Sequence, residues 1–270
     1  MPQIDIGDLK IHYTEKGSGD TLLIFPDHLQ SSLAYTEEID HFADRFHVLS
    51  FDYPGTGRST HERLYPDEQE FDLWTYWADL ACHLLLELDI DGCFAVGVDG
   101  GARVALHCAG KHAPAHRLAA RGVVADSFLA DLDSRALHRS LDLREHYYVR
   151  NASFLERQHG KDWRQVVDAD TAFLRRIADR GGYQVPDFVL NAAACPVLLT
   201  GHMQDMRTPG IAQEYARISA ITPDCSIYLM STSGHPHIEF PFMWSDPDSF
   251  RATADRFLDR VTRGSHNKER

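Results

Sequence analysis

Short apolar segments alternate with amphipathic segments along most of this chain, and this alternation limits its fold more than any other feature. The predicted strands cover 11–13, 21–25, 46–51, 93–98, 122–125, 196–200 and 226–230, and the main predicted helices cover 73–88, 102–109, 162–178 and 249–261. Strands that alternate with helices favour a mostly parallel sheet with helices on both faces. The active site of such a sheet lies beyond the carboxyl ends of its strands. The sequence therefore predicts an α/β fold.

The alternation is interrupted between residues 128 and 189, where charged and aromatic residues mix and no strand is predicted. We interpret 128–189 as a helical cap inserted into a core formed by 1–127 and 190–263. The last residues, 264–270, are expected to be a disordered tail.

The segment Gly97-Val98-Asp99-Gly100-Gly101 joins a predicted buried strand to a predicted helix. A sharp strand-to-helix turn strains the backbone at its apex and needs small neighbours there. Asp99 occupies this apex. Its carboxylate can displace a leaving group from an sp3 carbon, which forms an alkyl-aspartyl ester that water then hydrolyses. The alternative is that Asp99 only caps the following helix.

Two later loops supply partners for such a reaction. His235 follows the last predicted strand and is the candidate general base for the hydrolytic water. Asp205, in the loop after the strand at 196–200, is the favoured residue to orient His235. Asp126, which follows the strand at 122–125, is the alternative acid for the same task.

In their order along the chain, Asp99, Asp205 and His235 resemble the nucleophile, acid and histidine of the α/β-hydrolase fold. Residues 52–59 match the D-x-x-G-x-G-x-S loop of that family, and Gly234 with His235 matches its terminal G-H motif. The resemblance covers nearly the whole chain. It implies an α/β-hydrolase core with a cap.

At a finer level the chain is similar to the valacyclovir-hydrolase-like branch, because residues 159–163, which include Trp163, match its H-G-x-D-W segment. That branch has G-W-S-D-G-G at the turn, whereas this chain has one residue fewer and lacks the serine. This departure argues against ordinary esterase activity.

A second departure lies after the strand at 21–25, where the family has His-Gly and this chain has Pro26-Asp27-His28. By the resemblance, the amides of His28 and Gly100 would bind an oxyanion. A negative charge on Asp27 beside them would oppose that stabilisation, unless Asp27 is protonated or paired with His28.

Relatives with an aspartate nucleophile include epoxide hydrolases and haloalkane dehalogenases. The dehalogenases use a tryptophan after the aspartate to hold the halide, which Gly100 cannot do. Epoxide hydrolases use cap tyrosines to protonate the opening oxygen, and Tyr147, Tyr148 and Tyr183 are the candidates here. An epoxide hydrolase is therefore favoured over a haloalkane dehalogenase.

We expect a cytoplasmic enzyme that hydrolyses a small apolar or neutral electrophile, such as an epoxide, by Asp99 attack and water activated by His235. The first alternative is a non-hydrolytic cyclase, dehydratase or isomerase that uses Asp and His as general acid and base. The second is an inactive ligand-binding protein.

The net charge of −13 disfavours nucleic-acid and membrane-surface partners, because both need clustered basic residues. The five cysteines are scattered, as is typical of reduced thiols in a cytosolic protein. No dinucleotide motif or metal-ligand spacing is present, so no cofactor and no metal are expected. The substrate and the oligomeric state are not determined by the sequence.

Overall fold

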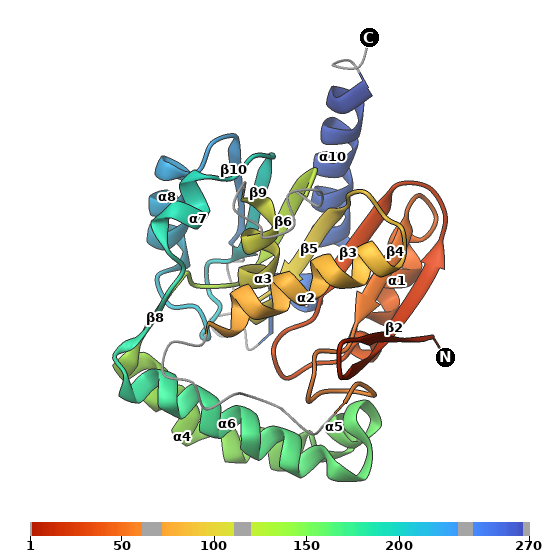
Figure 1. Ribbon diagram of the computed structural model, residues 1–270. Coiled ribbons are helices and arrows are strands. Elements are labelled where there is room, and N and C mark those ends of the chain that lie inside the picture. Colours follow the sequence, from red (N-terminus) through yellow and green to blue (C-terminus); the bar gives the residue numbers. More distant parts are fainter. Residues whose placement is uncertain (1, 61–71, 111–119, 232–239, 267–270) are drawn as a thin grey trace.

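One mixed sheet runs through the centre of the molecule (Figure 1), with the strand order β1-β2-β4-β3-β5-β6-β9-β10. The computed structural model describes the chain except for residues 1, 61–71, 111–119, 232–239 and 267–270, and except for the side chains of 143, 145–147 and 264–266. The strands are β1 (Gln3–Ile6), β2 (Leu9–Gly17), β3 (Thr21–Phe25), β4 (His47–Phe51), β5 (Phe94–Val98), β6 (Gly122–Asp126), β9 (Val197–His202) and β10 (Cys225–Met230).

The pairing of these strands confirms the predicted mostly parallel sheet. From β4 to β10 every neighbouring pair is parallel, while β2 is antiparallel to both β1 and β4. Strand β1 is an element that the sequence analysis did not predict. In the central strands β3, β5 and β6 every residue is buried, as expected when helices cover both faces of a parallel sheet.

The helices of the core divide between the two faces of the sheet (Figure 1). One face packs against α2 (Leu73–Glu87), α3 (Gly100–Ala109) and α8 (Ile211–Ile221). The other packs against α1 (Thr36–Phe42), α9 (Phe242–Ser245) and α10 (Pro247–His266). The short 3-10 helix η1 (Ser32–Tyr35) precedes α1.

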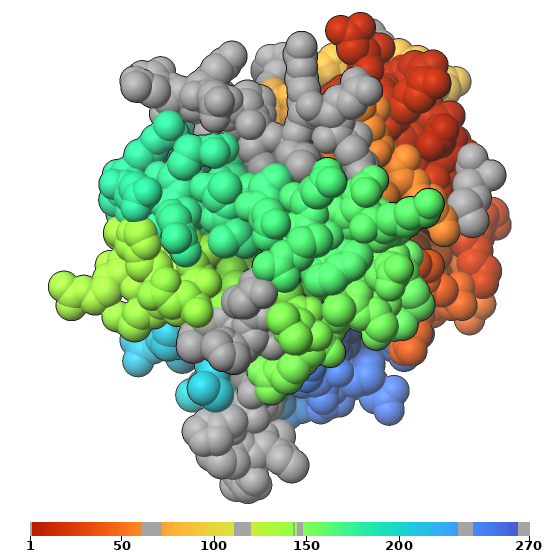
Figure 2. All heavy atoms as spheres, turned by 90° about the horizontal axis from the view of Figure 1, so that it is seen from below, coloured from red at the N-terminus to blue at the C-terminus, as the bar shows by residue number. Residues whose placement is uncertain are grey.

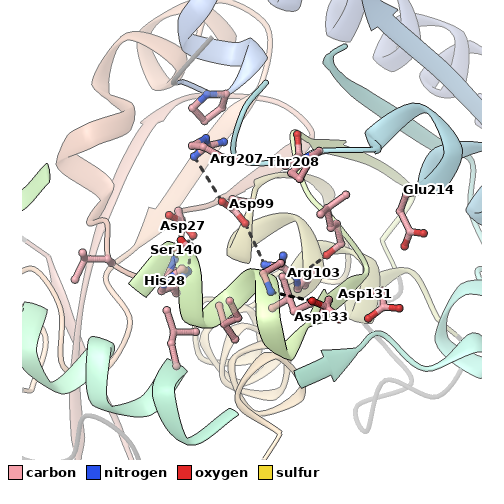
Figure 3. Close-up of a pocket in the computed structure, with 18 of the residues that line it drawn as sticks. Asp27, His28, Asp99, Arg103, Asp131, Asp133, Ser140, Arg207, Thr208 and Glu214 are labelled. Carbon is pink, nitrogen blue, oxygen red and sulfur yellow. Dashed lines mark hydrogen bonds and ion pairs between the residues drawn. The ribbon is translucent and has the colours of Figure 1, made fainter. Parts of the chain in front are cut away.

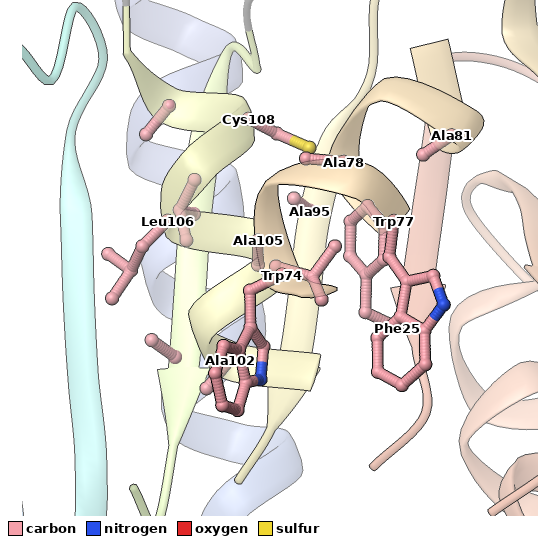
Figure 4. Packing of buried hydrophobic residues seen from close by; sticks show 14 of the residues in the cluster. Phe25, Trp74, Trp77, Ala78, Ala81, Ala95, Ala102, Ala105, Leu106 and Cys108 are labelled. Carbon is pink, nitrogen blue, oxygen red and sulfur yellow. The ribbon is translucent and has the colours of Figure 1, made fainter. Parts of the chain in front are cut away.

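Small side chains let α2 and α3 approach each other and the sheet closely. In Figure 4 the alanines of α3 face those of α2, and the rings of Trp74 and Trp77 fill the remaining space. Both indoles are almost completely buried. At the start of α2, the Asp72 carboxylate accepts hydrogen bonds from the amides of Trp74 and Thr75, at 3.0 and 3.3 Å. This cap fixes where α2 begins.

A helical layer lies across the carboxyl ends of the strands (Figure 1), and its atoms occupy the middle of the face shown in Figure 2. It consists of α4 (Ser134–Arg150), α5 (Ala152–His159), the 3-10 helix η2 (Gly160–Asp162) and α6 (Trp163–Asp179). We call it the α4–α6 layer. The strands β7 (Asp131–Asp133) and β8 (Gly182–Gln184) form an antiparallel pair beside it, and α7 (Asp187–Asn191) follows. The expectation that no strands occur between 128 and 189 was therefore wrong. The segment's two short strands offer too few residues for a recognisable alternation.

The end of α5 is tied to two loops of the core. The ring of His159 accepts a hydrogen bond from the amide of Gly57 at 2.9 Å through Nδ1, so its Nε2 donates to the carbonyl of Leu29 at 3.0 Å. The preceding residue, Gln158, accepts hydrogen bonds from the amide and hydroxyl of Ser31 at 2.9 and 3.2 Å. The H-G-x-D-W segment therefore begins with a residue that joins the α4–α6 layer to the core.

We predict that His159→Ala lowers the free energy of unfolding by about 2–4 kcal/mol, because it removes two buried hydrogen bonds to backbone groups and creates a cavity. Urea denaturation followed by circular dichroism measures this loss. His138→Ala is the matched control, since His138 is exposed and pairs with Asp179 on the surface, and it should change the free energy by less than about 0.5 kcal/mol. Equal losses in the two variants would contradict the prediction.

Two further features concern the chain as a whole. Helix α10 extends to His266, so it overlaps the segment 264–270 that was expected to be a disordered tail. Within the described ranges, no helix combines the length and the apolar character that crossing a bilayer requires.

Candidate active site

A cavity of about 710 Å³ lies between the carboxyl ends of the strands and the α4–α6 layer (Figure 3). Its walls come from the turn after β5, the loop after β3, helix α4 and the loop after β9. The side chains that line it include Asp27, His28, Trp74, Asp99, Arg103, Arg144, Tyr148 and Arg207. Charged groups of both signs therefore line this cavity together with aromatic rings.

The turn between β5 and α3 positions Asp99. Its backbone has φ 48° and ψ −108°, a conformation outside the favoured regions for an L-residue, which typically costs about 1–3 kcal/mol. The turn is this tight because two flanking glycines sit against backbone. A Cβ on Gly97 would collide with the carbonyl of Gly101, and one on Gly101 would collide with the carbonyl of Phe25. The structure thus has the strained apex that the sequence predicts.

The Asp99 carboxylate faces the cavity between two arginines (Figure 3). Its Oδ1 lies 3.1 Å from Arg103 Nη1, and its Oδ2 lies 3.5 Å from Arg207 Nη1. The side chain makes no capping hydrogen bond with α3. The alternative that Asp99 only caps its helix is therefore wrong, because the strained turn directs the carboxylate away from the first amides of α3.

The two amides expected to bind an oxyanion are already occupied. Asp27 Oδ1 accepts hydrogen bonds from the amides of His28, at 2.7 Å, and Gly100, at 3.0 Å. A Cβ on Gly100 would lie 2.8 Å from the same oxygen, so only glycine leaves room for it. The expectation that these amides are free to stabilise a substrate oxyanion is corrected here, because the chain supplies its own anion.

Asp27 is the end of a series of buried charges that extends into the α4–α6 layer. His28 Nδ1 lies 2.7 Å from Asp27 Oδ1, and His28 Nε2 lies 3.5 Å from Asp170 Oδ2. Asp170 lies in α6, and its Oδ2 is 2.6 Å from Arg144 Nη2 of α4. Two carboxylates therefore alternate with two cations.

These contacts keep all four groups charged. Burial would lower the pKa of His28, but Asp170 and Asp27 outweigh it and raise that pKa to about 10. Burial would raise the pKa of both carboxyl groups, but His28 lowers the pKa of Asp27, and His28 with Arg144 lowers that of Asp170. At neutral pH the amides of His28 and Gly100 therefore face an ionised carboxylate, which lies beside an imidazolium.

The raised pKa of His28 predicts a loss of stability in alkaline solution. The proton on His28 stabilises the fold fully below its ordinary pKa of 6.5, and this contribution disappears as pH rises to about 10. The free energy of unfolding of the wild type should therefore fall across this range relative to His28→Gln, by at most about 1.4 kcal/mol per pH unit.

Urea denaturation at a series of pH values measures this difference. His41→Gln is the control, because His41 pairs with Asp255 at the surface of the core. A wild-type advantage over His28→Gln that stays constant from neutral to alkaline pH would disprove the predicted proton linkage.

Asp205 binds the arginine that contacts Asp99. Its Oδ1 accepts a hydrogen bond from the amide of Arg207 at 2.8 Å, and its Oδ2 lies 3.4 Å from Arg207 Nη2. Burial raises the pKa of Asp205, against the opposing effect of Arg207. Arg207 is therefore held between two carboxylates, those of Asp205 and Asp99.

Asp126 is fully buried and anchors the start of α9. Its Oδ1 accepts a hydrogen bond from the Thr200 hydroxyl at 2.7 Å, and its Oδ2 accepts one from the amide of Met243 at 3.1 Å. Burial raises the pKa of Asp126 to about 7 despite these hydrogen bonds. Neither Asp126 nor Asp205 is among the described residues that line the cavity.

The raised pKa of Asp126 predicts a second loss of stability as pH rises, which comes from a carboxyl group and not from an imidazole. Between its ordinary pKa of 3.8 and about 7, the unfolded chain releases this proton while the folded protein keeps it. Stability from this group therefore falls as pH rises through that range, by at most about 1.4 kcal/mol per pH unit.

Asp126→Asn removes the titrating group and keeps the shape of the side chain. The wild type should therefore lose stability relative to Asp126→Asn between pH 4 and 7, which thermal melts at matched ionic strength detect as a fall in the wild-type Tm relative to that of the variant. A wild-type Tm that rises relative to the variant over this range would contradict the raised pKa.

The remaining candidates differ in how far the structure describes them. His235 falls within 232–239, outside the described residues, so its relation to Asp99 and Asp205 stays a prediction. Tyr147 lies in α4, but its side chain is also outside the described part. Tyr148 is buried and lines the cavity. Trp163 packs against the small apolar cluster to which Tyr148 belongs.

Tyr183 is not among the cavity-lining side chains of the described part of the chain. Its hydroxyl lies 3.2 Å from His107 Nε2 and donates a hydrogen bond to Asp72 at 3.5 Å, while its ring packs on Trp74. The proposal that Tyr183 donates a proton in the site is therefore corrected. Across the described residues, no three His, Cys, Asp or Glu side chains form a group that would hold a metal ion.

Four site residues were missed by sequence reasoning: Arg103, Arg144, Asp170 and Arg207. Arg103 was detectable, because a residue four positions after Asp99 in a helix lies on the same face. Arg207 lies two residues after Asp205, in a loop that was already singled out. Asp170 and Arg144 gave no such signal, since their place depends on how the α4–α6 layer packs.

Comparisons with known proteins agree with this architecture. The family model described as the alpha/beta hydrolase fold matches residues 20–217. An E-2-(acetamidomethylene)succinate hydrolase structure is similar at 19% identity and a TM-score of 0.69, over 96% of this chain and 98% of that one. The enol-lactonase from Burkholderia xenovorans LB400 is similar at 15% identity and a TM-score of 0.67, over 96% and 100%.

A hydrolase from Pseudomonas aeruginosa PA01 gives a TM-score of 0.70 at 16% identity, over 95% of this chain and 97% of that one. At such identities the likeness concerns the fold. No curated protein sequence gives a significant match.

Proposed function

Because this chain belongs to the α/β hydrolase fold family, we propose that it is an enzyme that hydrolyses a small neutral electrophile, such as an epoxide, through an ester formed on Asp99. The observation that carries this proposal is the Asp99 carboxylate, which stands at the strained apex and faces the cavity without capping its helix. A carboxylate that faces the cavity and does not cap its helix is available to react with a substrate.

Two cationic groups flank the Asp99 carboxylate. The guanidinium groups of Arg103 and Arg207 lie 3.1 and 3.5 Å from its oxygens. Attack by one oxygen on an sp3 carbon opens the epoxide and forms an alkyl ester on Asp99. Water then attacks the ester carbonyl, with His235 as the base proposed from the sequence. Tyr148, which lines the cavity, is the remaining candidate with a described side chain to protonate the epoxide oxygen.

A second candidate function follows from Asp27. Its carboxylate occupies both amides that would bind an oxyanion in an acyl-transfer reaction. Cyclisation, dehydration and isomerisation by proton transfer need no such oxyanion, and a carboxylate such as Asp99 can serve them as a general base. This alternative involves no covalent intermediate, which separates it from the first proposal.

Labelling with heavy oxygen distinguishes the two functions. The enzyme is allowed a single turnover in heavy-oxygen water with each of three probes, styrene oxide, phenyl glycidyl ether and benzyl bromide, and the peptide that contains Asp99 is analysed by mass spectrometry. We expect label in the Asp99 carboxylate, because water attacks the ester at its carbonyl carbon. Asp131, an exposed acid that lines the same cavity, is the internal control and should stay unlabelled.

Asp99→Asn should reduce turnover by at least about 1,000-fold, because the amide is a poor nucleophile. Turnover with Asp99 unlabelled would reject the nucleophile and favour proton-transfer chemistry. Binding of a probe with neither turnover nor label would favour a ligand-binding protein.

A further inference from the structure

Arg103 is the less exposed of the two arginines that contact Asp99. Its Nη1 lies 3.1 Å from Asp99 Oδ1, its Nε donates a hydrogen bond to the carbonyl of Leu129 at 3.0 Å, and its guanidinium lies 5.5 Å from the Trp74 ring centroid. The side chain is 3% exposed. A positive charge fixed in this way needs no rearrangement when negative charge develops nearby, which is the property of an effective electrostatic catalyst.

The backbone amides that usually stabilise an oxyanion in this fold are not available here. Hydrolysis of an ester on Asp99 places a negative charge on a carboxyl oxygen of Asp99 in the tetrahedral intermediate. The amides of Gly100 and His28 already donate to Asp27 Oδ1. Any stabilisation of the new oxyanion must therefore come from another group that contacts Asp99.

We propose that Arg103 replaces the amide oxyanion hole and stabilises the negative charge on Asp99 Oδ1 during ester hydrolysis, an inference that rests on the proposed function. Water attacks Cγ of the ester, and the carbonyl electron pair moves to Oδ1 beside Arg103. The pair then returns to re-form the carbonyl, the Cγ–Oδ2 bond breaks, and Oδ2 leaves with the alkyl group as an alkoxide. The proton that the base took from water passes to this alkoxide, and the remaining proton of the water oxygen is released as Asp99 becomes a carboxylate again.

The two oxygens of Asp99 take different parts in this reaction. Oδ1 faces the buried Arg103 at 3.1 Å, whereas Oδ2 faces Arg207 at 3.5 Å, and the Arg207 side chain is 32% exposed. The oxygen held more loosely, beside the more exposed group, is the one that can form a bond to the substrate. Oδ2 is therefore the nucleophile, and it leaves with the alcohol, so that the water oxygen remains in the carboxylate.

A purely positioning role for Arg103 makes a different prediction from a catalytic one. The ion pair stabilises the free carboxylate and lowers its nucleophilicity, so its loss should leave ester formation unchanged or faster. The ester is neutral and its tetrahedral intermediate is anionic, so the same loss should slow ester breakdown. If Arg103 only oriented Asp99, its loss would slow ester formation instead.

Rapid quenching followed by intact-protein mass spectrometry measures both steps, with the same three probes. For Arg103→Gln we expect ester breakdown to slow by about 100-fold to 1,000-fold, with formation no slower than in the wild type, so that the Asp99 adduct accumulates. Arg103→Lys keeps the charge without the planar guanidinium and should recover part of the breakdown rate.

Arg121→Gln is the matched control. Arg121 also forms an ion pair, with Asp20 at 2.8 Å, and lies 6.0 Å from the centroid of the Phe94 ring, but it is not a cavity-lining residue of the described chain. Its rates should equal those of the wild type. Circular dichroism of each variant reports the fold, and Arg103→Lys continues the test if Arg103→Gln does not fold.

The outcomes separate this inference from the proposed function. An Asp99 adduct that breaks down at the wild-type rate in both Arg103 variants would overturn the role of Arg103 and leave the nucleophile intact. Slower formation with unchanged breakdown would make Arg103 a positioning residue. If no adduct appears on Asp99 in the wild type or in any variant, the nucleophile itself is rejected, and the role of Arg103 with it.

Discussion

Alternation of buried charges is the constraint on which this site depends. An unpaired charge in a buried cavity costs several kcal/mol of desolvation, so each charge here needs a partner of opposite sign. One series joins Arg144, Asp170, His28 and Asp27, and its members keep their charges through mutual contact. Removing one member would take an oppositely charged partner from each of its neighbours.

A second series of charges surrounds Asp99 at the apex of the turn. Arg207 lies between Asp205 and Asp99, and Arg103 contacts Asp99 from the other side. These contacts fix the direction of the carboxylate. A fixed direction suits the attack on carbon that we propose for Asp99, although the same contacts reduce its intrinsic nucleophilicity. In the proposed mechanism, electrostatic contacts take the place of the two backbone amides that Asp27 occupies.

The core and the α4–α6 layer share the construction of the site. Asp170 and Arg144 pair with each other in the layer, and Asp27 and His28 lie together after a core strand, so the contact between His28 and Asp170 forms only when the two parts are packed together. His159 adds a second connection, to the Gly57 amide and the Leu29 carbonyl. The cavity is therefore complete only when the layer is packed on the sheet.

The sequence by itself determined the central strands, the tight turn at Asp99 and the loops that surround the cavity, because apolar runs, glycines and strand order are local features. It also contained Arg103, one helical turn after Asp99. Only the tertiary structure decided that the Asp27 carboxylate fills the amides of its own oxyanion hole, and that Asp170 keeps His28 charged. These contacts join segments far apart in the chain, and their geometry depends on packing that no local pattern encodes.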